Sequence, residues 1–107
     1  MKKTILDAAR VIRSKNSGPF ELTLDIMFKD RRLFELFRDR GIVSSQLICR
    51  LYGVTPEEIL TLVYFEPANA VKATIRRRIP SGAAGDTDIY GAQQHAPLLA
   101  IEFEDDQ

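Results

Sequence analysis

Residues 20–41, FELTLDIMFKDRRLFELFRDRG, decide the fold of this chain. In the first part of this stretch every second side chain is hydrophobic, which is the pattern of a strand that buries one face against a core. The inward residues of this strand are Leu22, Leu24, Ile26 and Phe28. Asp30 then supplies an N-cap for a helix, and Gly41 ends that helix. The core-facing residues of the helix are Leu33, Phe34, Leu36 and Phe37.

Two further helix starts follow. Ser44 or Ser45 caps a short helix that Gly53 ends. Thr55 and Glu58 have the spacing of a capping box, which predicts a third helix. The buried stripe of that third helix is expected to be Ile59, Leu60 and Val63.

The remaining segments predict more strands. Residues 71–75 and 99–103 both alternate between apolar and polar side chains, and the acidic tail after them is expected to fray. Residues 4–12 are too short to assign, because their apolar residues share a helical face and also fit a strand. The order of these elements predicts an α+β sandwich, with a small, mainly antiparallel sheet of three to five strands and two or three helices on one face.

Length and composition predict one domain spanning residues 1–107. Its 15 basic residues balance its 15 acidic residues, so no net positive charge favours a nucleic-acid partner. The single cysteine excludes an internal disulfide, and the N-terminal segment is too short and too charged for a signal peptide or a membrane span. We therefore expect a cytoplasmic protein with neither a nucleic acid nor a membrane as its partner.

Residues 13–19 are predicted to form a polar loop, because Asn, Ser, Gly and Pro occur together there. Two cations and small polar side chains next to a glycine suit a carboxylate or phosphate ligand. The candidate binding residues are Arg13, Ser14, Lys15, Asn16 and Gly18. An ordinary polar turn is the alternative interpretation.

Residues 80–99, PSGAAGDTDIYGAQQHAPLL, form a second polar stretch that is long for a connection in so small a domain. His95 is the candidate for proton transfer, because histidine titrates near neutral pH. Asp86 and Asp88 can join it in acid–base chemistry or bind a hard metal, and we assign them the catalytic role and no metal. The alternative is a structural role, because a lone histidine among amides and prolines is more often a structural hydrogen-bonding group. The neutral members of the predicted substrate site are Ser81, Gly82, Gln93 and Gln94.

The two polar segments are predicted to lie close together, because each connects to a core strand. Cations beside carboxylates would then form a polar site for an acidic substrate, or salt bridges that close the domain. None of the motifs GxxxxGK, GxGxxG, CxxC or HExxH occurs, so no cofactor can be assigned.

The segments IRSKNSGPFELTLDIMF and SGAAGDTDIYGAQQHAPLL resemble domain-of-unknown-function family 4387 over nearly the whole chain. This resemblance implies a partner, because such proteins are typically encoded beside a larger protein similar to the acyclic terpene utilisation (AtuA-like) family. Those larger proteins can carry a small C-terminal domain with a ferredoxin-like α+β fold. That domain begins with an RSGDKG-type turn, which residues 13–18 resemble, and the analogy favours an extended conformation for residues 4–12.

The resemblance therefore implies a ferredoxin-like two-layer sandwich that works as the small subunit of a two-component catabolic enzyme. A lyase- or hydratase-like reaction on a carboxylate or acyl-thioester substrate would suit this setting. The alternatives are a non-catalytic adaptor for the AtuA-like partner and a small module that binds an acidic metabolite. A homo-oligomer is compatible with each of these functions.

Overall fold

Strand β3 (Glu21–Phe28) lies inside a four-stranded antiparallel sheet in the computed structural model, which describes residues 1–76 and 95–106. The strand order is β2-β3-β5-β4. The other strands are β2 (Ala9–Gly18), β4 (Ile59–Phe65) and β5 (Ala70–Arg76). Leu24 of β3 lies opposite Ser14 of β2 and Ala73 of β5. The predicted alternation of β3 is confirmed, because its four inward residues are all buried.

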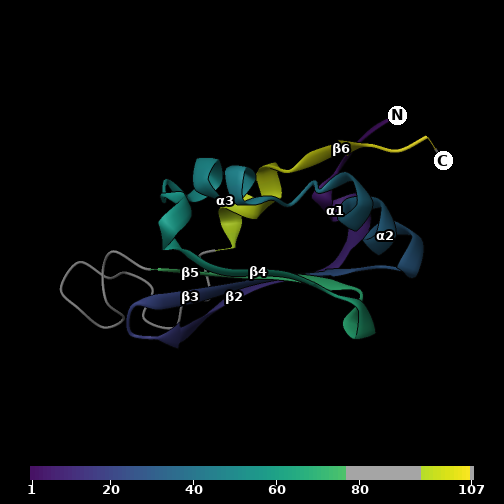
Figure 1. Cartoon of the computed structure of the whole chain (residues 1–107). Coiled ribbons are helices and arrows are strands. Elements are labelled where there is room, and N and C mark those ends of the chain that lie inside the picture. The colour runs from purple at the N-terminus through teal and green to yellow at the C-terminus, as the bar shows by residue number, and fades with distance from the viewer. Residues whose placement is uncertain (77–94, 107) are drawn as a thin grey trace.

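The helices lie on one face of this sheet (Figure 1). Helix α2 (Arg31–Arg40) begins and ends where the sequence predicts. The Asp30 side chain accepts a hydrogen bond from the backbone N–H of Leu33 at 2.9 Å. Gly41 has a φ of 60°, a left-handed conformation that a residue without a Cβ adopts at little cost. Both caps depend only on residues that are close in the sequence, so they can be predicted from the sequence alone.

Helix α3 (Ser45–Tyr52) has boundaries of the same kind. Of the two candidate caps, Ser44 is the one whose hydroxyl accepts a hydrogen bond from the backbone N–H of Leu47, at 3.2 Å. Gly53 ends the helix with a φ of 65°. The predicted second helix is therefore confirmed.

The predicted third helix is wrong. The capping contact is present, since the backbone N–H of Thr55 donates to Glu58 Oε1 at 2.9 Å. It supports only the single 3-10 turn η1 (Pro56–Glu58), and β4 begins directly after it. The segment ILTLVYF is rich in branched and aromatic residues, and pairing with β5 satisfies its backbone better than a short helix on the same core. Strand alternation places Leu62 and Tyr64 against the core, and leaves Val63 exposed.

The N-terminal segment contains both of the conformations that its sequence allowed. Strand β1 (Lys2–Thr4) leads into one helical turn, α1 (Ile5–Ala8), and β2 follows at once. Ile5 and Ala8 are fully buried. The extended conformation implied by the resemblance therefore holds for residues 9–12 and not for residues 5–8.

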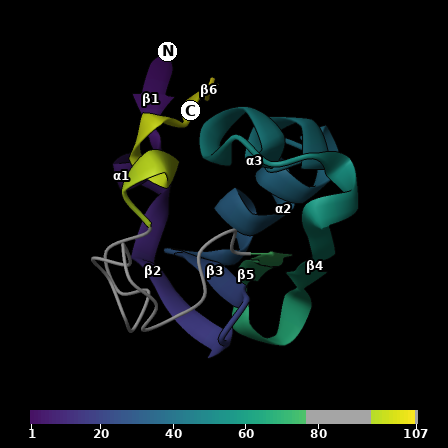
Figure 2. The same cartoon turned by 90° about the vertical axis from the view of Figure 1, so that its left-hand side faces the viewer.

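The two ends of the chain lie side by side (Figure 2). The 3-10 helix η3 (Ala96–Ala100) leads into β6 (Glu102–Glu104), which pairs antiparallel with β1. The predicted strand over residues 99–103 is therefore shorter than expected, and Leu99 is exposed within η3. Phe103 is buried, as the alternation predicts.

The acidic tail does not fray at Asp105, whose side chain is 1% exposed. Arg32 of α2 donates to both carboxylate oxygens, at 3.1 and 3.0 Å, and Lys3 Nζ lies 3.1 Å from Oδ2. A bidentate guanidinium–carboxylate pair is among the stronger polar contacts in proteins. It ties the C-terminal strand to α2 and β1.

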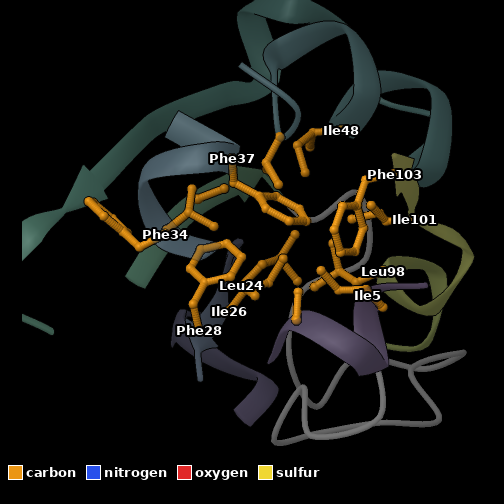
Figure 3. Close-up of a cluster of buried hydrophobic side chains, with 14 of the residues drawn as sticks. Ile5, Leu24, Ile26, Phe28, Phe34, Phe37, Ile48, Leu98, Ile101 and Phe103 are labelled. Atoms are coloured by element: carbon orange, nitrogen blue, oxygen red, sulfur yellow. The ribbon is translucent and has the colours of Figure 1, made fainter. Parts of the chain in front are cut away.

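The core lies between the sheet and the helices and is centred on Phe37 (Figure 3). The ring of Phe37 lies 4.7 Å from that of Phe28 on β3 and 4.9 Å from that of Phe103 on β6, measured between centroids. These are favourable tilted and edge-to-face distances. One side chain of α2 thus connects the main sheet to the terminal strands.

The predicted α+β sandwich, with a small antiparallel sheet and helices on one face, is confirmed. Its connectivity differs from the β-α-β-β-α-β order of the ferredoxin-like fold. Two hairpins, β2–β3 and β4–β5, flank one helical segment, and β3 pairs antiparallel with β5.

Candidate functional site

Only part of the predicted site lies among the residues that the structure describes. Arg13, Ser14, Lys15, Asn16 and Gly18 lie on β2, and His95 precedes η3. The others lie outside the described residues: Ser81, Gly82, Asp86, Asp88, Gln93 and Gln94. Whether the two polar segments form one site therefore stays a prediction.

The first polar segment is a strand and not the loop that its composition predicts. Strand β2 extends to Gly18, and the chain turns at residues 19–20. Polar residues are tolerated here because β2 is an outer strand of the sheet, with a neighbour only on the β3 side among the described strands.

Strand alternation separates the candidate binding residues of β2. Ser14 and Asn16 pair with Leu24 and Leu22 and so face the helices, whereas Lys15 pairs with Thr23 and faces the opposite side of the sheet. Ser14 and Asn16 therefore cannot join the lysine in one binding surface.

Arg13 is occupied by a structural contact. Its Nε donates to Asp25 Oδ2 at 3.0 Å, across the β2–β3 pair. The Asp25 side chain is only 3% exposed, so removing its partner would leave a buried charge without compensation. Among the described residues Asp25 Oδ1 has no hydrogen-bond partner, which makes the arginine contact more important for this carboxylate.

His95 occupies the N-cap position of η3 and is partly buried. Its backbone carbonyl accepts a hydrogen bond from the N–H of Leu98 at 2.9 Å. Leu98 is buried in the core beside Ile5 (Figure 3). The position of the His95 backbone is therefore fixed by core packing, which suits either a catalytic or a structural role.

The two outer strands of the sheet differ sharply in chemistry. Strand β2 carries three cations, Arg10, Arg13 and Lys15, which we call the charged edge. Strand β4, with the sequence ILTLVYF, has no charged residue. Its Leu60, Val63 and Phe65 are 40%, 50% and 44% exposed, and we call these three residues the apolar edge.

The apolar edge is a candidate interface that the sequence interpretation missed. The helical assignment placed Leu60 and Val63 in a buried stripe, and both are exposed. The period-two alternation of Leu62 and Tyr64 against Val63 and Phe65 indicates that the last two are exposed. Leu60 departs from this alternation, because a register shift against β5 lies between Ile59 and Thr61. A capping box lies just before this run, and it led to the prediction of a helix in place of a strand.

The groups with shifted pKa values make structural contacts. The hydrogen bond to Asp105 raises the pKa of Arg32, and the hydrogen bond to Asp39 raises that of Arg38. Burial raises the pKa of the Tyr52 hydroxyl.

Burial also raises the pKa of Tyr64, against the opposing effect of a hydrogen bond that its hydroxyl donates to the Val43 carbonyl at 2.9 Å. The same hydroxyl accepts from the Val43 N–H at 3.1 Å. This pair of contacts fixes β4 to the segment between α2 and α3.

Two general properties of the described residues bear on function. No group of three or more His, Cys, Asp or Glu side chains among residues 1–76 and 95–106 is placed to hold a metal ion. Within the same residues no helix has the length and apolar character needed to cross a membrane.

Together the fold and its edges define a small α+β sandwich protein with one charged and one apolar sheet edge. The chain belongs to the family described as domain of unknown function (DUF4387), whose model matches residues 5–102. No curated protein and no solved structure matches the chain.

Proposed function

We propose that this chain is the small subunit of a cytoplasmic two-component catabolic enzyme and docks on an AtuA-like large subunit through the apolar edge. The complex acts on a carboxylate or acyl-thioester substrate in a lyase- or hydratase-like reaction. The observation that carries this proposal is the exposure of Leu60, Val63 and Phe65 on an outer strand without charged residues.

An outer strand with unpaired backbone groups and apolar side chains favours pairing with another chain. Proteins that work alone commonly prevent this with charged residues, and β2 has them. Strand β4 lacks them, so we expect a strand of the partner to add to the sheet there. The three exposed side chains would then contact the partner and lose their exposure to water.

The chemistry is assigned to the second polar segment. In this proposal His95 moves a proton, with Asp86 and Asp88 as its acid–base partners. The large subunit completes the site at the interface. This assignment rests on the side-chain chemistry of these residues and on the resemblance of the segment to its family.

The test is co-expression of the chain with its AtuA-like neighbour, followed by purification through a tag on the large subunit. We expect a stable complex that converts candidate 2-enoyl or hydroxy acids faster than the large subunit alone. His95→Ala and Asp86→Asn should each lower this rate without dissociating the complex. Failure of the two chains to co-purify would refute the proposal.

A non-catalytic adaptor is the second candidate, and the apolar edge favours it too, because docking needs none of the polar residues. The same experiment separates the two functions. Full activity of both variants in an intact complex would assign the chemistry to the large subunit and leave this chain as an adaptor.

A further inference from the structure

A groove of about 370 Å³ lies between α3 and the β1–β6 ribbon, away from the apolar edge. This volume is within the range of small-molecule sites. Ile42 and Leu47 form part of its wall, and Ala100 and Ile101 form another part. Ile42 and Leu47 are partly buried and pack against the core, so they supply the apolar surface of the groove, whereas Ile101 is buried and adds little.

The charged residues at this groove leave an excess of positive charge. Lys2, Arg50 and Glu102 contribute to its lining. Lys2 Nζ lies 3.8 Å from Glu102 Oε1, and both side chains are more than half exposed, so this ion pair is weak. The side chain of Arg50 makes no ion pair or hydrogen bond with the described residues. Its guanidinium is therefore available to a ligand.

We infer that this groove binds a small monocarboxylate with a short apolar chain. The carboxylate would accept hydrogen bonds from Arg50, whose planar guanidinium matches its two oxygens. The apolar chain would lie against Ile42 and Leu47. Lys2 adds a second positive charge at the same rim.

The lining also indicates which ligands do not fit. Two cations against one carboxylate in the lining disfavour an amine, and a dicarboxylate would place a second charge against the apolar wall or beside Glu102. The inference rests on the proposed function in one respect, because it assigns the acyl or carboxylate ligand of the two-component enzyme to a groove on the small subunit.

The test is titration of the isolated full chain with hexanoate, followed by backbone amide NMR shifts of Leu47, Arg50 and Ala100. We expect saturable shifts that are confined to the groove. Hexylamine at the same concentrations should give none, and Arg50→Gln should weaken hexanoate binding about ten-fold. Arg10→Gln removes an exposed cation from β2 and is the matched control, with unchanged affinity expected.

Three results would overturn the inference: no saturable shift up to about 10 mM hexanoate, equal shifts with hexylamine, or unchanged affinity in Arg50→Gln. These results are independent of docking, because the titration contains no partner. A chain that co-purifies with the large subunit but does not bind hexanoate would refute the groove alone. A chain that binds hexanoate but does not co-purify would refute the proposed function alone.

Discussion

The two outer strands belong to the same antiparallel sheet, but their side chains give the two edges opposite chemical character. The charged edge on β2 has three cations, which hinder the addition of another strand, whereas register shifts occur on both outer strands, two on β2 and one on β4. The apolar edge on β4 has no charge and three exposed hydrophobic side chains. We infer from this difference that the protein prevents pairing at one edge and permits it at the other.

The largest expected effect concerns the core that both edges share. Phe37→Ala removes the ring between Phe28 and Phe103 and should lower the free energy of unfolding by about 3–5 kcal/mol. Urea denaturation followed by circular dichroism measures this change. A loss of less than about 1 kcal/mol would show that the two sheets do not depend on this contact.

Val63→Glu should weaken docking on the partner at least about 100-fold, because it places a charge in the proposed interface. The fold should tolerate the change, since Val63 is exposed and lies opposite Lys72 on β5, where a glutamate finds a cation. Surface plasmon resonance against the immobilised large subunit measures the affinity. Arg10→Glu, which changes the charge by two units on the charged edge where Val63→Glu changes it by one, should leave the affinity unaltered.

Tyr64→Phe tests the assignment of the inward and outward faces of β4, because Tyr64 faces the core while Val63 does not. Loss of the hydroxyl leaves the N–H and carbonyl of Val43 without this partner and should cost about 1–2 kcal/mol of stability. Docking should be unchanged. If docking fell while stability did not, the assignment of faces on β4 would be wrong.

The same tyrosine gives a prediction for alkaline pH. Burial raises the pKa of Tyr64 in the folded protein, so above pH 10 the unfolded chain ionises first and binds fewer protons. The contribution of Tyr64 to stability should therefore be constant below the unfolded pKa and should decline as the pH rises beyond it. In Tyr64→Phe this decline should be shallower in denaturation curves recorded from pH 9 to about 11.

The smallest effect is expected at the charged edge. Lys15→Val removes one of its three cations and should change the stability by less than about 0.5 kcal/mol. The variant should self-associate more strongly than the parent chain at high concentration. Sedimentation velocity detects this, and a strictly unchanged profile would show that this lysine does not prevent pairing.

The features that could be predicted from the sequence are those that depend on residues close to each other in the chain. Alternation identified the inward side of β3, and Asp30, Ser44, Gly41 and Gly53 marked the ends of two helices, because caps are local contacts. Strand β4 was missed because a satisfied capping contact at Thr55 does not force a helix to continue.

Long-range contacts account for the other features that the sequence did not predict. The tail is ordered at Asp105 by Arg32, which is 73 residues away in the chain. The groove near Arg50 combines both ends of the chain with α3. The strand at residues 13–18 is stabilised by pairing with β3, against the loop preference of its composition.

The most direct test of the central claim is amide hydrogen exchange of the chain, free and bound to the proposed AtuA-like large subunit. Binding should slow exchange across Ile59–Phe65, because a strand that adds at β4 would protect its outward N–H groups. Exchange across Ala9–Gly18 should stay the same. Protection of β2 with no change on β4 would contradict the assignment of the two edges.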